Sequence, residues 1–176
     1  MSTGRLSAGD IRRLFDELAV ELTSRGTRAE LFLVGGAAIA LCFDSRRATR
    51  DLDAAFAPTS EVRRAAEAVA EREGLDPLWL NDAVKGYLHG ADPNAVRFFE
   101  APSLVVDVAS AEYLLAMKLF SSRTEVDADD IALLYREVGF TTVEEGLDLV
   151  ERAYPGRPIE PKVQFLLEEI VESFRS

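Results

Sequence analysis

The hydrophobic positions of this chain follow two periods, one typical of strands and one typical of helices. Apolar side chains recur every three or four residues between Ser7 and Arg25, which predicts an amphipathic helix with a capping box from Ser7 and Asp10. Short apolar runs predict strands at 29–34, 51–56, 75–80, 95–100 and 104–108. Because Pro77 interrupts the third of these runs, we expect that strand at the edge of a sheet.

Further helices follow most of the predicted strands, and only helices are predicted after residue 110. The predicted helices span 36–43, 60–72, 111–121, 143–154 and 161–174, and two more end at Leu88 and Val138. This order indicates an α/β fold, with a small mixed sheet flanked by helices and a helical C-terminal part from about residue 111. Since single domains commonly run to about 100–200 residues, we expect one domain over residues 1–176.

Composition limits the class of protein. Hydrophobic residues make up 48% of the chain, yet no apolar run approaches the roughly 18 residues of a membrane-spanning helix. The first residues show no basic segment followed by an apolar one, so we expect a cytoplasmic protein without a signal peptide. The net charge of −11 argues against a broad basic surface, and any contact with nucleic acid would have to be local.

The stretch from Leu31 to Phe56 concentrates the residues that indicate chemistry. Gly35 and Gly36 lie where a predicted strand turns into a helix, and backbone without Cβ atoms at a helix start can approach an anion closely. Asp51 and Asp53 are two residues apart, so a strand would place both on the face opposite its apolar residues. The glycine pair and the two carboxylates together predict a phosphate–metal site. As alternatives, the glycines could form a plain turn, and the carboxylates could form a surface cluster of salt bridges with the nearby arginines.

Two further observations extend this stretch. Arg46, Arg47 and Arg50 lie beside the two carboxylates. Gly35-Gly36 followed by Arg47-x-Thr49-x-Asp51-Leu52-Asp53 resembles the signature of the polymerase-β-type nucleotidyltransferase superfamily. Within that superfamily the chain looks most similar to small bacterial AbiEii-like and related nucleotidyltransferases, several of which are toxins of toxin–antitoxin pairs. The stretches from Trp79 to Leu88 and from Ala111 to Leu134 share the resemblance.

The resemblance implies an activity with defined partners. It implies Mg²⁺-dependent transfer of a nucleoside monophosphate from a nucleoside triphosphate to an RNA 3′ end or a protein hydroxyl, at a two-metal site. It also implies an antitoxin-like protein as a further partner. The carboxylates expected to hold the metal are Asp51, Asp53 and Asp107, with Asp107 on the strand next to the other two.

The third carboxylate and a lysine each have a second interpretation. Asp107 interrupts the apolar run LVVDV, where an aspartate is costly unless it is paired or binds a cation; it could instead cap the segment that follows. Lys118 lies on the strongly apolar helix 111–121, and the resemblance places it at the active site; it could instead extend along the helix to solvent.

The remaining expected roles concern the nucleotide. Gly35 and Gly36 would hold the triphosphate, Thr49 would donate its hydroxyl, and Arg47 with Lys118 or Arg123 would balance phosphate charge. Gly36 departs from the pattern, since active members often carry Ser there. A second hypothesis is therefore an inactive binding module that acts through a protein partner.

Three residues outside the motif complete the sequence predictions. We expect Cys42 to be a small buried residue and His89 to lie on the surface or in a loop. Lys85 has two possible roles: a solvated surface lysine or a contact to a substrate phosphate.

Overall fold

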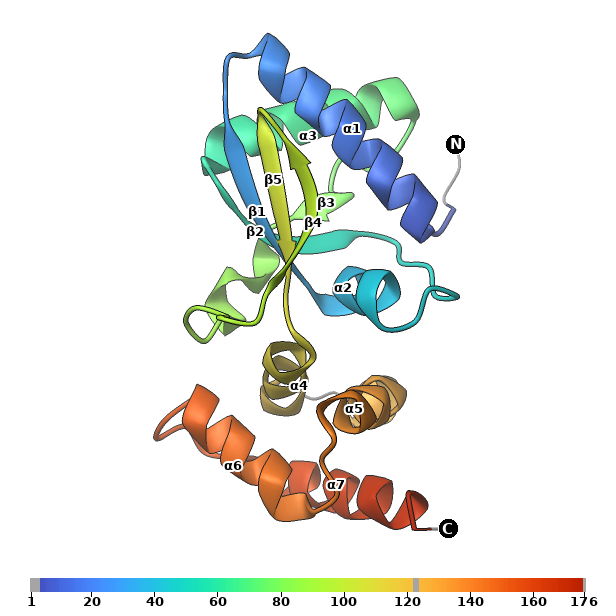
Figure 1. The fold of residues 1–176 in the computed structure, drawn as a ribbon, viewed down its shortest axis with the longest axis vertical. Helices are drawn as coiled ribbons and strands as arrows, with labels where there is room; N and C mark the ends of the chain where they lie inside the picture. Colours follow the sequence, from blue (N-terminus) through green and yellow to red (C-terminus); the bar gives the residue numbers. More distant parts are fainter. Residues whose placement is uncertain (1–3, 122–123, 176) are drawn as a thin grey trace. The chain divides into compact units, whose positions relative to one another are not determined.

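The computed structural model describes residues 4–121 and 124–175, and the chain divides into two compact units (Figure 1). The sheet unit comprises Met1–Gly86 and Asn94–Ala109, and the helical unit comprises Tyr87–Pro93 and Ser110–Ser176. The predicted α/β fold with a helical C-terminal part is confirmed. The expectation of one domain over the whole chain stays a prediction.

The sheet is mixed, as the sequence predicts, and its strands lie in the order β3-β2-β1-β5-β4. The strands are β1 (Ala29–Val34), β2 (Leu52–Ala57), β3 (Leu80–Asn81), β4 (Val96–Ala101) and β5 (Leu104–Val108). Strand β1 is antiparallel to β2 and parallel to β5, and β4 and β5 form a hairpin. The edge strand predicted at 75–80 is misplaced: β3 is an edge strand of only two residues, Leu80–Asn81, and shares Leu80 alone with the predicted range.

Helices α1 (Ala8–Ser24) and α3 (Thr59–Glu73) lie side by side and contact the strands (Figure 1). The register pairs Leu31 of β1 with Phe56 and Val106, and all three side chains are buried. On the same side of the sheet the ring of Phe99 packs against Phe15 of α1, so this face carries the core of the unit. Because side chains alternate along a strand, the opposite face carries Phe32, Asp53 and Asp107. We call it the carboxylate face.

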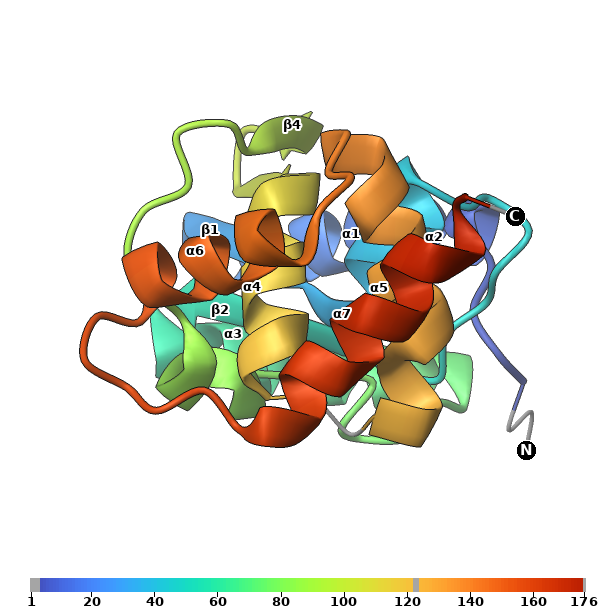
Figure 2. The same ribbon diagram turned by 90° about the horizontal axis from the view of Figure 1, so that it is seen from below.

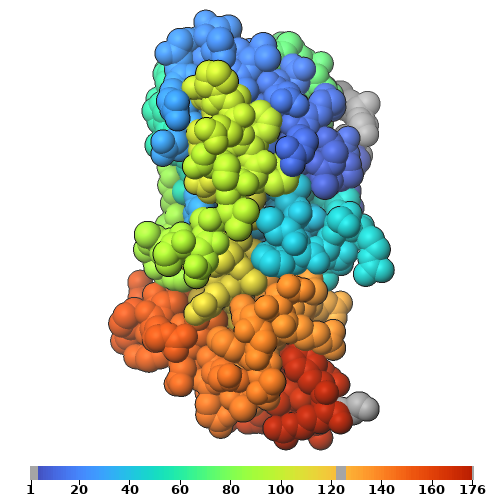
Figure 3. Space-filling model, viewed as in Figure 1, coloured from blue at the N-terminus to red at the C-terminus, as the bar shows by residue number. Residues whose placement is uncertain are grey.

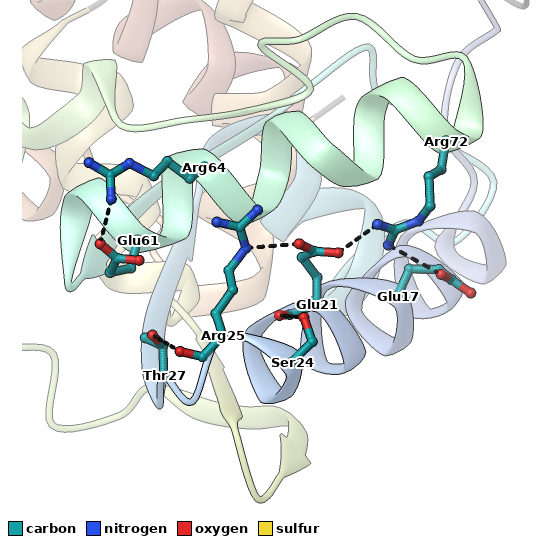
Figure 4. A network of polar contacts seen from close by, with 8 residues as sticks. All are labelled: Glu17, Glu21, Ser24, Arg25, Thr27, Glu61, Arg64 and Arg72. Atoms are coloured by element: carbon teal, nitrogen blue, oxygen red, sulfur yellow. Dashed lines mark hydrogen bonds and ion pairs between the residues drawn. The ribbon is translucent and has the colours of Figure 1, made fainter.

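Helix α1 begins as predicted, and ion pairs join it to α3. Ser7 and Asp10 form the capping box, and Gly26 follows the helix with a φ of 65°. Figure 4 shows Glu21 of α1 between two guanidinium groups, those of Arg25 at 2.8 Å and of Arg72 of α3 at 2.6 Å. These contacts fix the two helices that cover the core face.

Helix α2 (Gly35–Cys42) follows β1 without an intervening loop. Gly35 has a φ of +68°, a left-handed conformation that lets the chain turn directly from the strand into the helix. The expectation that Cys42 is buried is wrong: the thiol is exposed, because the buried residues of α2 end at Ala40.

In its described residues, the helical unit contains four α-helices: α4 (Ala111–Phe120), α5 (Thr124–Val138), α6 (Val143–Ala153) and α7 (Pro161–Ser173). Figure 2 gives a second view of them; α4 packs on α5 and α6, and α7 packs on α5 and α6. None of the helices in residues 4–121 and 124–175 is long and apolar enough to cross a membrane.

The segment 87–93 follows the 3₁₀ helix η1 (Ala83–Tyr87) and is bound to these helices. Asp92 accepts hydrogen bonds from the backbone and hydroxyl of Ser110, the N-cap of α4, at 2.7 and 3.0 Å. His89 lies in a loop, as predicted, and its ring stacks on Tyr113 with 3.9 Å between centroids. The hydroxyl of Tyr154 donates to the carbonyl of Tyr87. The segment is therefore part of the helical unit.

Candidate functional site in the sheet unit

The glycine turn and one of the paired carboxylates form a single feature. In the register of β1 and β2, Val34 pairs with Asp53, so Asp53 lies beside the residue that precedes Gly35. A Cβ atom built on Gly35 would be 2.9 Å from Oδ2 of Asp53, closer than real Cβ contacts. The left-handed φ favours glycine, and a Cβ atom here would also force the carboxylate of Asp53 to shift.

Thr49 lies against the second glycine. A Cβ atom on Gly36 would be 3.6 Å from the hydroxyl oxygen of Thr49, an ordinary contact. That hydroxyl donates to the carbonyl of Asp51 at 2.9 Å, and the backbone of Thr49 exchanges hydrogen bonds of 2.6 and 3.0 Å with Leu6. The N-terminal segment thus fixes the loop that carries Thr49, a contact that nothing in the sequence pattern indicated.

Asp51 and Asp53 differ in their surroundings. Strand β2 begins at Leu52, so Asp51 precedes the strand and is exposed, whereas Asp53 is half-buried within it. In the part of the chain that the structure describes, the carboxylate of Asp51 accepts no hydrogen bond or ion pair. An exposed carboxylate without an ion pair can accept a ligand without first giving up a partner.

Arg47 is bound by a residue that sequence analysis missed. The carboxylate of Asp44 accepts from Nε of Arg47 at 3.1 Å and from Arg46 at 3.4 Å. Desolvation opposes ionisation of Asp44, but the hydrogen bonds from the two arginines outweigh it and lower the pKa of this carboxyl group. The side chain of Arg46 is 93% exposed, so the loop presents positive charge to solvent.

Two predictions about Asp107 are wrong. Strand β1 lies between β2 and β5, so Asp107 is not on the strand next to the paired carboxylates. Its side chain is not buried either, since it is 37% exposed and pairs with Arg97 at 2.5 Å. Asp107 pairs with Phe32 in the register, and Asp53 pairs with Val34, so both carboxylates still lie on the carboxylate face.

Arg97 and Glu100 are further residues that sequence analysis missed. Nη1 of Arg97 donates to Glu100 at 2.9 Å while Nε donates to Asp107, and these hydrogen bonds raise the pKa of Arg97. A bulge between Arg97 and Phe99 changes the phase of β4, which brings Arg97 and Glu100 to the same face. The adjacent Phe98 and Phe99, which break the alternation, were the only sequence signal.

The side chains of this site have the chemistry of Mg²⁺ ligands, but they are not arranged as a group that could hold the ion. Carboxylate oxygens are the ligands that Mg²⁺ prefers, and Asp51 and Asp53 supply them at the start of one strand. Among the described residues, no three His, Cys, Asp or Glu side chains are grouped so that they could hold a metal ion. Arg123, an expected nucleotide contact, lies outside the described residues.

The two candidate lysines are both paired with carboxylates. In the helical unit Lys118 is 19% exposed and contacts Asp127 at 2.5 Å and Asp130 at 2.9 Å. Lys85 in the sheet unit contacts Asp82 at 3.0 Å and the hydroxyl of Thr59 at 2.9 Å, on the surface. The active-site role of Lys118 stays a prediction.

Comparison with known proteins identifies a family. No curated protein and no solved structure matches the chain. Residues 10–154 match the model of a family described as "Nucleotidyltransferase of unknown function (DUF6036)". This range covers most of the chain and includes the glycine turn, the paired carboxylates and Lys118. The chain therefore belongs to this family of nucleotidyltransferases of unknown function.

Proposed function

We propose that this protein transfers a nucleoside monophosphate from a nucleoside triphosphate to a hydroxyl group, on an RNA 3′ end or on a protein. The observation that carries the proposal is the approach of Gly35 to Asp53, where a Cβ atom would be 2.9 Å from the carboxylate. A turn that could accept phosphate oxygens and a carboxylate that could accept a cation are thereby adjacent, as transfer from a metal-bound triphosphate requires.

The chain's own residues account for binding of the triphosphate. The first backbone N–H groups of α2, at Gly35 and Gly36, have no helical partners and suit phosphate oxygens. Thr49, held against Gly36, would donate its hydroxyl to the same group in exchange for its hydrogen bond to the carbonyl of Asp51. Arg47 would add positive charge from the neighbouring loop, in exchange for part of its contact with Asp44.

Asp51 and Asp53 would hold the cation, and Asp107 is the proposed third carboxylate on the same face. Bound Mg²⁺ would lower the pKa of the attacking hydroxyl and neutralise the charge that develops on the phosphate. Asp53 would also keep the cation side of the site next to the glycine turn, because the register with Val34 fixes its position.

A second function, nucleotide binding without transfer, has its own support. Gly36 lacks the hydroxyl that active relatives often carry, and Asp107 is paired with Arg97. The described residues also lack a ready-made group of three metal ligands. A protein with these features could bind a triphosphate and act only through a protein partner.

Label transfer separates the two functions. The purified chain is incubated with Mg²⁺ and each of four α-³²P nucleoside triphosphates, with total RNA or with the protein alone as the acceptor. We expect transfer that falls about 100-fold or more in Asp53→Asn. Asp16→Asn, an exposed residue of α1 with the same change of charge, serves as the control. Triphosphate binding without any transfer would support the second function instead.

The toxin role is a further part of the proposal. If the transfer modifies an essential RNA or protein, expression of the chain in a bacterial host should slow growth. Asp53→Asn should restore growth at an equal level of protein. Slow growth that persists in Asp53→Asn would exclude nucleotidyl transfer as its cause.

A further inference from the structure

Two exposed arginines face each other across a backbone bridge at the edge of the candidate site. Leu6 and Thr49 form an isolated antiparallel bridge, in which each backbone N–H donates to the carbonyl of the other residue, at 2.6 and 3.0 Å. In an antiparallel pair, the residue before one partner lies opposite the residue after the other. The bridge therefore places Arg5 across from Arg50, and both residues are exposed.

Neither guanidinium group is bound by another side chain or by a carbonyl within residues 4–121 and 124–175. Other arginines on the surface of the sheet unit are paired, among them Arg13 with Glu73 and Arg72 with Glu21. An arginine without a carboxylate partner keeps its five N–H donors available to an incoming anion. An anion that binds at Arg5 and Arg50 therefore has no ion pair to break.

The position of these arginines is fixed by the fold. Leu6 is only 7% exposed, so its side chain anchors the segment that carries Arg5. The loop that carries Arg50 protrudes from the surface of the sheet unit, in cyan in Figure 3, and also carries Arg46, which is 93% exposed. We call Arg5, Arg46 and Arg50 the arginine patch.

The arginine patch is a local exception to the charge of the chain. The sequence has 31 acidic and 20 basic residues, so most of the surface repels anions. Asp44 contacts both Arg46 and Arg47, and thus neutralises only part of the charge of the loop. Asp51 directly follows Arg50, but a cation bound as proposed would offset its charge. The patch therefore attracts an anionic partner to the edge of the site.

The place of the patch indicates the kind of partner. Arg50 directly follows Thr49, whose hydroxyl lies against Gly36 in the proposed triphosphate site. An acceptor with its reacting hydroxyl at the α-phosphorus would extend from there over the neighbouring surface. A polynucleotide carries a phosphate beside its terminal nucleoside and another at each further nucleotide, and a planar guanidinium group binds phosphate oxygens in pairs. A protein hydroxyl brings no such row of charges.

We propose that the arginine patch binds the phosphates of a single-stranded polynucleotide whose 3′ hydroxyl is the acceptor. This inference rests on the proposed function, and it selects a nucleic-acid acceptor over a protein hydroxyl. The 3′ oxygen forms the new bond to the α-phosphorus, pyrophosphate leaves, and the hydroxyl proton passes to water. Because phosphate contacts give affinity without reading bases, the strand is bound with little dependence on its sequence.

Fluorescence anisotropy of a labelled single-stranded RNA of about ten nucleotides tests the patch, with the full chain and without triphosphate. Arg5→Gln and Arg50→Gln should each weaken binding about two- to fivefold, as the loss of one exposed ion pair allows. The double variant should weaken binding about tenfold. The slope of log affinity against log salt concentration should become shallower by about 0.7 for each arginine removed.

Arg175→Gln is the matched control. Arg175 is also exposed and also has no side-chain partner among the described residues, but it belongs to the helical unit. Its replacement makes the same change of net charge and should leave RNA affinity and the salt slope unchanged. Urea unfolding should give equal stability for the unmodified chain and for Arg5→Gln with Arg50→Gln, because neither arginine loses a partner.

Two further probes identify the chemistry of the partner. A DNA strand of the same sequence should bind about as well as the RNA, because both present phosphates. Binding of the RNA alone would show recognition of its 2′-hydroxyl groups and would overturn the phosphate contact. Poly-glutamate of equal total charge should bind more weakly than the RNA. Equal binding of poly-glutamate would favour an acidic protein as the partner and would overturn the inference.

The outcomes distinguish this inference from the proposed function. If label passes to RNA but the double Gln variant binds and labels RNA like the unmodified chain, the patch is wrong and the transfer stands. If label passes to the protein alone, a protein hydroxyl is the acceptor and the inference is wrong. If no acceptor receives label while RNA binding still depends on Arg5 and Arg50, the proposed transfer is wrong and only the binding surface remains.

Discussion

The backbone of Gly35 lies so close to the carboxylate of Asp53 that a methyl group could be placed there only if this side chain moved. A Cβ atom at this position would be 2.9 Å from Oδ2, and the residue also has a φ of +68°. Two separate requirements for glycine therefore coincide where β1 turns into α2. The first prediction separates them.

Gly35→Ala should destabilise the chain more than Gly74→Ala. Gly74 ends α3 with the same φ of +68°, but a Cβ atom there meets nothing within 4 Å. The left-handed conformation alone costs about 1–2 kcal/mol, and contact with Asp53 should add to this only at Gly35. Urea unfolding measures both free energies. The additional loss of stability at Gly35 should disappear when Gly35→Ala is made in a chain that already carries Asp53→Ala. If it remains, the added methyl group does not clash with Asp53.

Gly36→Ser should be tolerated and should tighten triphosphate binding. A Cβ atom at Gly36 would lie 3.6 Å from the hydroxyl of Thr49, an ordinary contact, and the new hydroxyl could donate to a phosphate oxygen. A hydrogen bond to a charged group supports roughly a tenfold gain in affinity. Calorimetric titration with a nucleoside triphosphate and Mg²⁺ measures it. Gly9→Ser makes the same change at the second position of α1 and should have no effect; an equal affinity in all three proteins would refute a phosphate contact at Gly36.

Lys118→Met should destabilise the helical unit by about 2–4 kcal/mol, because Asp127 and Asp130 would each lose a close ion pair in a poorly hydrated position. Lys85→Met, in an exposed pair, should cost less than about 1 kcal/mol. Combining Lys118→Met with Asp127→Asn and Asp130→Asn should recover much of the stability. If nucleotidyl transfer recovers as well, Lys118 has a structural role alone; transfer that stays lost supports the predicted active-site role.

Glu21 should make the contact between α1 and α3 dependent on pH. The hydrogen bond from Arg72 lowers the pKa of Glu21 below its ordinary 4.5. A pKa that is lower in the folded chain means that the stabilisation is complete above about pH 4.5 and is lost as the pH falls through the folded-state pKa. Glu21→Gln should therefore cost about 1 kcal/mol at pH 7 and less at pH 3.

Urea unfolding at the two pH values checks this, with Glu17→Gln as the control. Glu17 makes a single ion pair to Arg72, at 3.7 Å, and is more exposed than Glu21. Its replacement should have a smaller effect at pH 7. Equal costs for Glu21→Gln at both pH values would show that its contacts do not depend on its charge.

Local sequence patterns predicted the elements well because they act over a few residues. Strands β1 and β5 have the predicted bounds, and the capping box of α1 is where Ser7 and Asp10 indicated it. Strand order is different, because it depends on pairings between distant segments. Nothing in the local pattern showed that β1 would separate β2 from β5, and the expected neighbourhood of Asp107 was wrong for that reason.

The residues of the candidate site that lie close together in the structure come from one short stretch of sequence. Gly35 follows β1 and Asp53 lies on β2, the next strand along the chain, and the pairing of these two strands brings the residues together. The ion partners could not be predicted in the same way: Arg97 reaches Asp107 and Glu100 only because a bulge changes the phase of its strand. Cys42 was misplaced because an apolar helix does not show in its sequence which end reaches the surface.

The division of the chain into units has a consequence for biosynthesis. The chain passes from the sheet unit to the helical unit at Gly86, returns at Asn94 and leaves again after Ala109. Strand β1 emerges early from the ribosome, yet its parallel partner β5 begins only at Leu104. Until β5 has been synthesised, the edge of β1 that pairs with it has no neighbour in the nascent chain. Residues 87–93 are also synthesised before all the α-helices of the helical unit, to which they belong. A split-protein design cut at any of these three crossings would therefore divide at least one unit between the two fragments.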